Sequence, residues 1–418
     1  MTAESIAAAL AVAAKDASAA LGRSDGATRN RALEVLSRKL RAETRRVLDA
    51  NVRDLEAARD GGITGPSLER LKLTPERIEQ MAVGVDEVRA LRDPVGAIEG
   101  LEIRPNGLQV GRMRIPLGVI CIIYESRPNV TIDAGALCIK SANTPILKGG
   151  KEAFHSNAVL VELMRESLVE ARLPADAVQA VATSDRDVMT ALIRRDREID
   201  LVIPRGGEGL IRYVTEHATV PVIQHYKGVC HVYVDRDAEL EMAADIAFNA
   251  KVQRPGVCNA AETLLVHRDI APRLVEALFP RLEAAGVELR ADPRIRALWP
   301  HAKAATDADW SEEYLDLVLA VRMVDNLDVA IGHILRYGSN HTEAIVTSSY
   351  ATSLRFLREV PSSCVIVNAS TRFNDGFELG LGAEIGISTS KLHAYGPMGL
   401  EELTTRKFVV LGQGQVRG

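Results

Sequence analysis

The sequence is short of several things, and each shortage excludes a class of protein. Aromatic residues make up only 4% of the chain, so aliphatic side chains must fill its cores. The five cysteines are scattered and never form a Cys-x-x-Cys pair, which fits neither a disulfide framework nor a zinc ribbon. The nine histidines show no ligand spacing either, so the sequence predicts no metal site.

Long apolar runs and basic tracts are also missing. No run approaches the roughly 18 apolar residues that span a bilayer, and Glu4, Lys15 and Asp16 make the alanine-rich start an amphipathic helix rather than a signal peptide. Lys plus Arg (51) nearly balances Asp plus Glu (56), which argues against a nucleic-acid surface. The length of 418 residues predicts two or three domains, and the scattered cysteines favour a reducing, cytoplasmic compartment. The ordinary composition agrees with an enzyme, and we expect no nucleic-acid or membrane partner.

The chain has instead a clear alternation of helical and strand-like segments. Residues 1 to about 92 carry apolar side chains at helical spacing, and Thr74 ahead of Pro75 predicts a helix start. From Leu117 onward, short apolar runs alternate with helical stretches, and a second such pattern follows from Glu262. This alternation predicts parallel, doubly wound α/β sheets, which bind ligands at the carboxyl ends of their strands.

Two strand-like segments, 98–104 and 108–115, stand apart from this pattern. The turn between them contains Asn106-Gly107, which favours the positive φ values of a tight hairpin. A hairpin with three arginines and few apolar positions is hard to stabilise alone, so we expect it to project and pair with another subunit. An ordinary surface hairpin is the alternative. The β-prone tail segment 408–411 is a further candidate partner strand for another subunit.

The segment Gln253–Asn259 presents a cysteine, Cys258, on a loop between a helical run and the β-prone segment 263–267. Such a cysteine is held by the scaffold without being packed inside it, as a nucleophile must be. The alternative is a small buried hydrophobe, which is the usual fate of a free cysteine.

Two glycine-rich turns follow predicted strands, at Lys148–Lys151 and at Pro204–Gly209. Glycines ahead of a helix let backbone N–H groups approach a phosphate, and the helix dipole favours the anion. Neither turn matches G-x-G-x-x-G or the P-loop pattern, so ordinary turns are the alternative. Lysines where an NAD site has an acidic residue favour NADP.

Seven segments carry a family resemblance when they are taken together and in order. They are Ile115–Ile120, Tyr124–Val130, Leu147–Ala153, Ile203–Gly207, Gln253–Asn259, Asn368–Phe373 and Leu381–Ser388. In this order they closely resemble the γ-glutamyl phosphate reductases, also called glutamate-5-semialdehyde dehydrogenases, a family within the aldehyde dehydrogenase superfamily.

The resemblance implies an α/β, aldehyde dehydrogenase-like fold. It comprises a Rossmann-like NADPH-binding domain (1–97 and 116–250), an α/β catalytic domain (251–389) and a β oligomerisation flap (98–115 and 390–418). The implied reaction is the NADPH-dependent reduction of L-glutamyl 5-phosphate to L-glutamate 5-semialdehyde, through a cysteine thioester and with release of phosphate, in proline biosynthesis. A small-molecule substrate, a homo-oligomer and glutamate kinase are the implied partners.

The resemblance also implies roles for individual residues. Cys258 is similar to the superfamily nucleophile. The implied cofactor contacts are Lys148 for the adenosine ribose, Gly206 and Gly207 for the turn beneath the pyrophosphate, Glu313 for the nicotinamide ribose, and Ser126. At Glu313 the pattern departs from the superfamily, because Leu315 stands where phenylalanine is usual; a solvated acidic pair is the alternative.

The oxyanion donor of the superfamily is an asparagine after the first buried strand. A gapless count puts Arg127 at that position, so Asn129 is the nearby amide that we assign, with a helix N-cap as its alternative role. For the substrate's α-carboxylate the candidates are Arg372, Ser370 and Ser388. A surface ion pair is the alternative for Arg372.

Hydrolytic relatives activate water with a glutamate, and the corresponding stretch, Gln224–His231, contains no carboxylate. A thioester on the cysteine would therefore resist hydrolysis, which suits exchange with phosphate. His225 could in principle replace the missing base. Two other functions remain open: an aldehyde dehydrogenase-like oxidoreductase for another acyl phosphate or acyl thioester, and an inactive relative that binds a metabolite or a partner.

Overall fold

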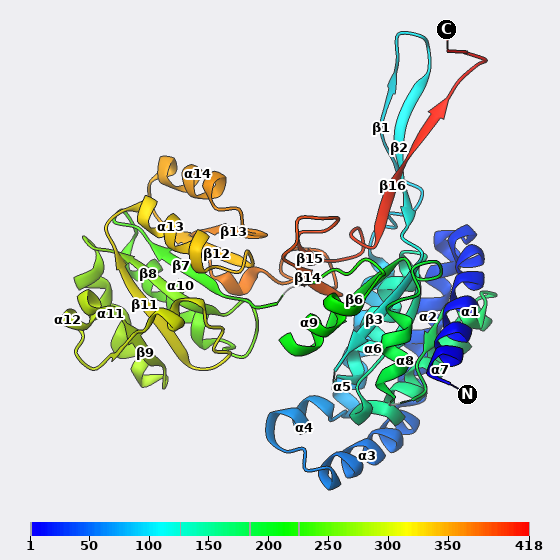
Figure 1. Ribbon diagram of the computed structural model, residues 1–418, viewed down its shortest axis with the longest axis horizontal. Coiled ribbons are helices and arrows are strands. Elements are labelled where there is room, and N and C mark those ends of the chain that lie inside the picture. The colour runs from blue at the N-terminus through cyan, green and yellow to red at the C-terminus, as the bar shows by residue number, and fades with distance from the viewer. Residues whose placement is uncertain (1, 126, 184, 225, 418) are drawn as a thin grey trace. The chain divides into compact units, whose positions relative to one another are not determined.

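The chain folds into two compact units, each built from separate stretches of sequence (Figure 1). The computed structural model describes residues 2–125, 127–183, 185–224 and 226–417. The first unit comprises Met1–Gln224, Leu381–Gly386 and Met398–Gly418, and the second comprises His225–Gly380 and Ile387–Pro397.

Helices open the first unit, as the apolar spacing predicts. They are α1 (Ala3–Arg23), α2 (Gly26–Ala42), α3 (Thr44–Asp60), α4 (Gly65–Leu71) and α5 (Pro75–Ala90). Helix α5 begins as predicted. The Thr74 hydroxyl accepts the Arg77 N–H, and Pro75 occupies the first helical position, where its missing N–H costs nothing.

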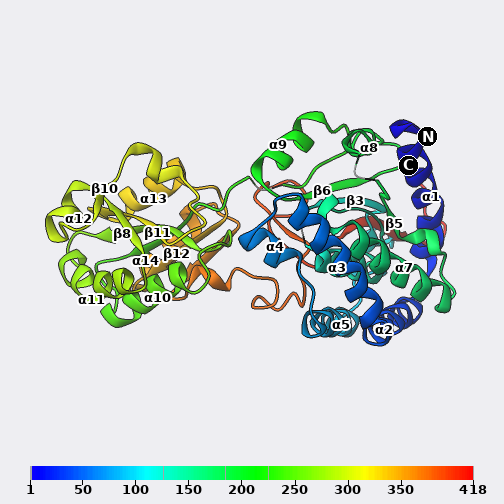
Figure 2. The same cartoon turned by 90° about the horizontal axis from the view of Figure 1, so that it is seen from below.

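A four-stranded parallel sheet of order β5-β4-β3-β6 forms the core of the first unit. Its strands are β3 (Val119–Tyr124), β4 (Thr144–Lys148), β5 (Gln179–Ala180) and β6 (Leu201–Arg205). The helices between these strands are α6 (Pro128–Lys140), α7 (Phe154–Glu170) and α8 (Arg186–Leu192), and α9 (Glu208–His217) follows β6. Figure 2 shows α7 and α8 on opposite sides of this sheet, the doubly wound arrangement that was predicted. The apolar run 220–223 forms only a single bridge, Val202 to Val222, because Pro221 has no N–H for a ladder.

Helix α1 is long and apolar enough to cross a membrane by length and composition alone. In this structure its alanine face, with Ala7 and Ala11, packs in the core against β3 residues such as Val119. Lys15 on the same helix forms an ion pair of 3.1 Å with Asp200. The helix is therefore a core element of the first unit, as its amphipathic pattern predicts.

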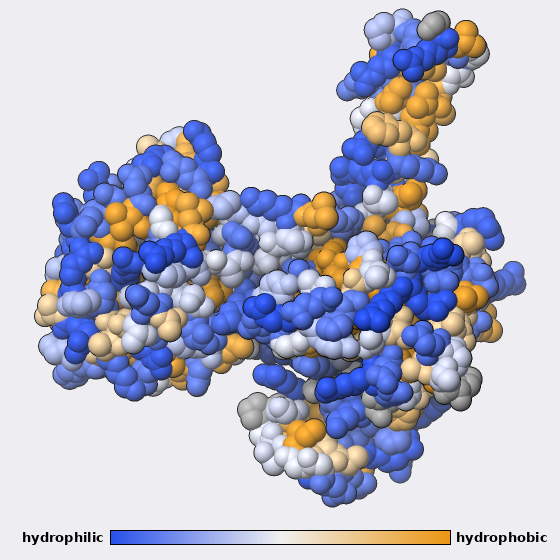
Figure 3. Space-filling model, in the orientation of Figure 1, coloured by the Kyte–Doolittle hydropathy of each residue, from blue (hydrophilic) through white to orange (hydrophobic). Residues whose placement is uncertain are grey.

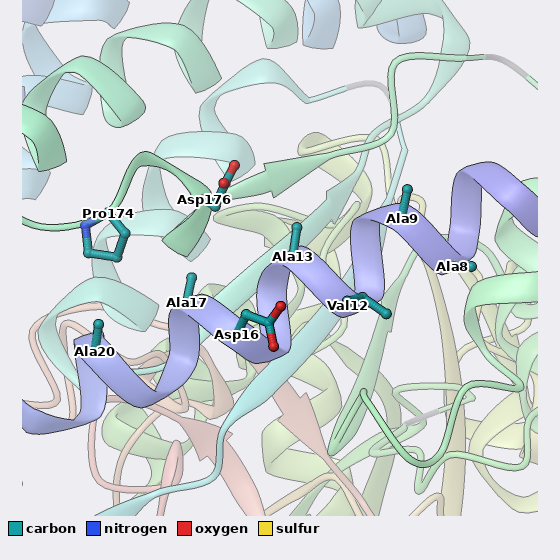
Figure 4. A pocket seen from close by; sticks show the side chains of 9 residues that line it. All are labelled: Ala8, Ala9, Val12, Ala13, Asp16, Ala17, Ala20, Pro174 and Asp176. Carbon is teal, nitrogen blue, oxygen red and sulfur yellow. The ribbon is translucent and has the colours of Figure 1, made fainter.

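A hollow of about 660 Å³ runs along the other side of α1 (Figure 4). Alanines line much of it, and the carboxylates of Asp16 and Asp176 give it a negative character. None of the predicted site residues that the structure describes lines this hollow. It therefore lacks the donors that a nucleotide phosphate needs.

The second unit is built on a seven-stranded parallel sheet of order β10-β9-β11-β8-β7-β12-β13. Its strands are β7 (Cys230–Val234), β8 (Ala261–His267), β9 (Glu288–Ala291), β10 (Lys303–Ala304), β11 (Val318–Val324), β12 (Thr342–Val346) and β13 (Cys364–Val367). Its helices are α10 (Leu240–Val252), α11 (Ala271–Ala284), α12 (Pro293–Leu298), α13 (Leu327–Tyr337) and α14 (Tyr350–Glu359).

This unit begins before the predicted domain boundary at residue 251. The reason is that β7 and α10 belong to it: β7 pairs with β8 on one side and β12 on the other, and α10 packs with α11 on one face of the sheet. Helix α13 packs on the opposite face, around Tyr233 and Phe356. The domain roles that the family resemblance implies stay a prediction.

The predicted hairpin is confirmed, and a third strand completes it. Strand β1 (Ile98–Ile103) pairs antiparallel with β2 (Gln109–Pro116), and β2 pairs antiparallel with β16 (Thr404–Leu411) of the chain's own tail. The tail strand therefore pairs with β2 of its own chain, and its pairing with another subunit stays a prediction. This flap projects from the first unit, and Figure 3 shows apolar side chains on it; Ile103 and Phe408 are 75% and 68% exposed.

Candidate active site

Cys258 lies on the loop between α10 and β8, at the amino edge of the second unit's sheet. The helix ends at Val252, and Pro255 and Gly256 turn the chain before β8 begins at Ala261. The side chain of Cys258 is partly exposed, as the sequence predicts for a residue held by the scaffold but not packed inside it.

The other four cysteines have environments that keep their thiols protonated. Burial raises the pKa of Cys121 to about 12 and that of Cys364 to about 11. Burial also raises the pKa of Cys138 and of Cys230. Because the thiolate is the nucleophilic form, Cys258 is the cysteine best suited to covalent chemistry.

Gly228 makes a close backbone contact with the cysteine. A Cβ at this position would lie 2.1 Å from the Cys258 carbonyl oxygen and 2.9 Å from its Cα, so no other residue fits without moving the loop. The N–H of Gly228 donates to Oε1 of Glu313 over 2.8 Å. Glu313 is half-buried and thus is not simply part of a solvated acidic face.

The same loop carries positive charge. Nε of Arg372, in the short 3-10 helix Thr371–Phe373, donates to the Gln253 side-chain oxygen over 2.8 Å. Burial, followed by the charge of Arg254, lowers the pKa of Arg372, while the Asp375 carboxylate and then Cys258 raise it. The Arg372 guanidinium thus lies next to the cysteine loop, with a carboxylate as well as a second guanidinium near it.

The two serines assigned to the substrate carboxylate are both buried and bonded locally. The Ser370 hydroxyl accepts the Arg372 N–H over 3.3 Å and caps its short helix. The Ser388 hydroxyl donates to the Ser390 carbonyl over 3.2 Å. Their substrate role stays a prediction.

The predicted cofactor turn lies in the first unit, where β6 leads into α9. Gly207 precedes the first residue of α9, and its N–H donates to the Glu125 carboxylate over 3.0 Å. A Cβ at Gly206 would lie 2.6 Å from the same carboxylate oxygen. The turn thus binds a carboxylate oxygen in this structure, and the same backbone N–H suits a phosphate oxygen.

Lys148 ends β4, as predicted, and its Nζ donates to the Gly149 carbonyl over 3.0 Å. Burial lowers the pKa of this lysine, whereas the nearby carboxylate of Glu152 raises it. Ser126, the remaining predicted cofactor residue of the first unit, lies outside the described residues, as does His225, the proposed substitute base.

Asn129 occupies the second position of α6, whose first residue is Pro128. Its side-chain N–H donates to Asp133 over 2.9 Å, and burial raises the pKa of that carboxyl to about 6. Arg127 stands at the N-cap position, so the alternative role of Asn129 as an N-cap is not what the structure shows. Its oxyanion role stays a prediction.

Sequence reasoning missed two buried groups that support the cysteine loop. Nζ of Lys251 donates to Glu262 over 2.7 Å and to the Asp316 carbonyl over 3.0 Å, which ties the end of α10 to β8. The thiol of Cys230 donates to the Cys258 carbonyl over 3.1 Å. Neither pairing leaves a signal in the sequence, because the partners are far apart or belong to different elements.

The chain has relatives that match it over nearly its whole length. The family model "Aldehyde dehydrogenase family" matches residues 1–315. A γ-glutamyl phosphate reductase from Desulfovibrio desulfuricans is 55% identical over 413 residues, 98% of each chain, and one from Solidesulfovibrio magneticus is 56% identical over 406 residues, 97% of each. The solved γ-glutamyl phosphate reductase of Thermotoga maritima matches with a TM-score of 0.97 at 43% identity, covering 99% of this chain and 100% of that one.

The two α/β units, the exposed cysteine loop and the glycine turn ahead of α9 define an oxidoreductase of the aldehyde dehydrogenase type. Within that class, the chain belongs to the γ-glutamyl phosphate reductase family.

Proposed function

We propose that this chain reduces L-glutamyl 5-phosphate to L-glutamate 5-semialdehyde with NADPH and releases phosphate, as a cytoplasmic step of proline biosynthesis. The observation that carries the proposal is Cys258, which is partly exposed on its loop. The chain's curated relatives named γ-glutamyl phosphate reductase are 53–56% identical over nearly their whole length.

The chain's own groups supply the acyl-transfer step. The Cys258 thiolate attacks the acyl carbon, a sulfur–carbon bond forms, and the carbon–oxygen bond to phosphate breaks with its electron pair leaving on phosphate. The main-chain N–H of Cys258 and the amide of Asn129 are the proposed donors to the oxyanion. Phosphate is a good leaving group, so no general acid is needed.

NADPH, when bound, supplies the hydride that brings the thioester to the aldehyde level. The residues proposed to hold it are Lys148, Gly206, Gly207, Glu313 and Ser126. The N–H that Gly207 offers to a carboxylate supports a phosphate subsite at this turn. A glycolyl-CoA reductase that shares the fold at 15% identity was solved with bound NADP+. The preference for NADPH over NADH rests on the lysines of the turn Lys148–Lys151, of which Lys148 is the proposed cofactor contact.

The substrate's α-carboxylate is proposed to bind Arg372, and the hydroxyls of Ser370 and Ser388 are its further proposed donors. The guanidinium of Arg372 already contacts Gln253 of the cysteine loop, which supports this choice. The stretch Gln224–His231 contains no carboxylate that could activate water. We therefore expect the thioester to react with phosphate or hydride faster than it is hydrolysed.

The proposed partner is a second copy of the chain, joined through the flap of β1, β2 and β16. The exposed apolar side chains Ile103, Phe408 and Val410 on these strands support that surface. Glutamate kinase is a further proposed partner, and it rests on the family resemblance alone.

The test is phosphate-dependent reduction of NADP with glutamate semialdehyde. Wild-type protein should show it, and Cys258→Ala should lose it together with NADPH oxidation by the acyl phosphate, while its circular dichroism spectrum stays unchanged. Substantial activity in the folded variant would remove Cys258 from this role. Turnover with coenzyme A but not with phosphate would favour the alternative, a related oxidoreductase for acyl thioesters.

A further inference from the structure

A buried thiol lies directly behind the cysteine loop. Sγ of Cys230, the first residue of β7, is 3.1 Å from the Cys258 carbonyl oxygen and 3.5 Å from Nδ1 of His341. Cys230 is completely buried, and the missing side chain of Gly228 is what lets the two backbone segments approach. The thiol can therefore donate its single proton to the main chain of the proposed nucleophile.

The contacts continue from Cys230 into a ring. Nδ1 of His341 is 2.6 Å from the Thr342 hydroxyl, which accepts an N–H of Asn374 over 2.7 Å. The Asn374 carbonyl in turn accepts a side-chain N–H of Asn259 over 3.0 Å. Asn259 directly follows Cys258, so the ring starts at the Cys258 carbonyl and returns to the next residue. Each of these four side chains is at most 4% exposed.

One hydrogen bond of the ring has a direction that explains why a thiol stands at this position. The Cys258 carbonyl can only accept, so the Cys230 thiol donates its proton there. The Thr342 hydroxyl accepts from Asn374, and its contact with Nδ1 of His341 joins the imidazole, which also contacts the thiol, to the same network. Buried polar groups are costly unless paired, so the ring holds the peptide between Cys258 and Asn259 in one orientation.

We propose that Cys230 is a positioning residue for Cys258: its thiol, through the ring of His341, Thr342, Asn374 and Asn259, fixes the main chain that aims the Cys258 sulfur. The inference rests on the proposed role of Cys258 as nucleophile. Cys230 itself touches neither the substrate nor the reacting atoms in this assignment.

The test compares Cys230→Ala, which removes the donor, with Cys230→Ser, which keeps one. Two quantities are measured: kcat and KM for phosphate-dependent NADP reduction, and the rate at which iodoacetamide alkylates Cys258, located by mass spectrometry. Cys230→Ala should lower kcat by about tenfold to a hundredfold with KM little changed, because a misaimed reacting atom costs rate rather than binding. It should also change the alkylation rate, and Cys230→Ser should restore most of both.

Cys138→Ala is the matched control, since Cys138 is equally buried but lies in α6 of the first unit. Wild-type values for both measurements are expected there. Should Cys230→Ala fail to fold, Thr342→Val interrupts the same ring with nearly unchanged volume, and it should lower kcat in the same sense.

Two results would overturn the proposal: a folded Cys230→Ala or Thr342→Val that matches the Cys138→Ala control, or a Cys230→Ser as defective as Cys230→Ala. Failure of the proposed nucleophile looks different. In that case, wild-type protein alkylated at Cys258 would keep its turnover. The alkylation rates of wild type and variants, which need no turnover, would still show whether Cys230 changes the position of the Cys258 sulfur.

Discussion

At the scale of single residues, Gly228 meets the tightest constraint near the cysteine. Alanine there would place a Cβ 2.1 Å from a backbone oxygen, so we expect Gly228→Ala to displace the Cys258 loop and lower kcat at least tenfold. Gly84→Ala is the control, because Gly84 lies inside α5 with open space around it. The higher helix propensity of alanine should raise the free energy of unfolding by about 1 kcal/mol and leave kcat unchanged. Steady-state kinetics and thermal unfolding of both variants check the expectation; wild-type kinetics in Gly228→Ala would contradict it.

Lys148 carries the cofactor preference in the proposed function. Lys148→Ala should raise KM for NADPH more than KM for NADH, because only NADPH has the 2′-phosphate that a lysine at the end of β4 would bind. Both constants come from initial rates with the acyl phosphate or, in reverse, with NADP and NAD. Equal increases in KM for NADPH and NADH would show that Lys148 does not recognise the 2′-phosphate.

At the scale of elements, Asp309 joins a 3-10 helix (Asp307–Ser311) to β9. Its carboxylate accepts from Thr306 in a capping box and from Arg290 over 2.7 Å, and it is 5% exposed. Burial opposes ionisation, but the hydrogen bonds from Arg290 and Thr306 outweigh it and hold the pKa of Asp309 below its ordinary value. A lowered folded-state pKa contributes stability that is present above the ordinary value of about 3.9 and is lost as the pH falls.

Asp309→Asn should therefore lower the free energy of unfolding by about 1–3 kcal/mol at neutral pH, and by less below about pH 4. Urea unfolding at the two pH values measures the difference. The exposed Asp328, which pairs with Arg355 on the surface, is the control, and Asp328→Asn should change little at either pH. A destabilisation of Asp309→Asn that is the same at both pH values would contradict the argument.

Elements were predictable where the signal is local. Thr74 and Pro75 mark the start of α5, the apolar run after Leu117 gives β3, and Asn106-Gly107 gives the hairpin. Pro221 broke a segment that apolar content alone favours as a strand. The family of the chain and the position of Cys258 on its loop also followed from the sequence, because motif order and turn residues are local information.

What could not be predicted depends on contacts between distant residues. Nothing near Cys230 in the sequence indicates that its thiol meets the Cys258 carbonyl, because that meeting requires the parallel register of β7 and β8. The pairing of Lys251 with Glu262 depends on how the end of α10 packs against β8. Nor does the tail segment 408–411 reveal that its partner is β2 of the same chain.

At the scale of the whole molecule, the flap sets the expected state of association. Ile103 and Phe408 are 75% and 68% exposed, and we expect exposed apolar surface of this kind to form the proposed interface between subunits. The double variant Ile103→Asp, Phe408→Asp should lower the mass measured by sedimentation or light scattering, since charge cannot be buried cheaply between subunits. Tyr350→Asp, at a 77% exposed position of α14, is the control and should leave the mass unchanged. Unchanged mass in the flap variant would place the interface elsewhere.

The pairing of β16 with β2 joins residue pairs such as Thr404 and Pro116, and Leu403 also accepts hydrogen bonds from Leu117 and Asn143. During synthesis, the residues of β2 emerge from the ribosome hundreds of residues before those of β16. The second unit's sheet, by contrast, is complete once β13 has emerged. The edge of β2 therefore stays open until β16 arrives, and until then it is available for pairing with other chains.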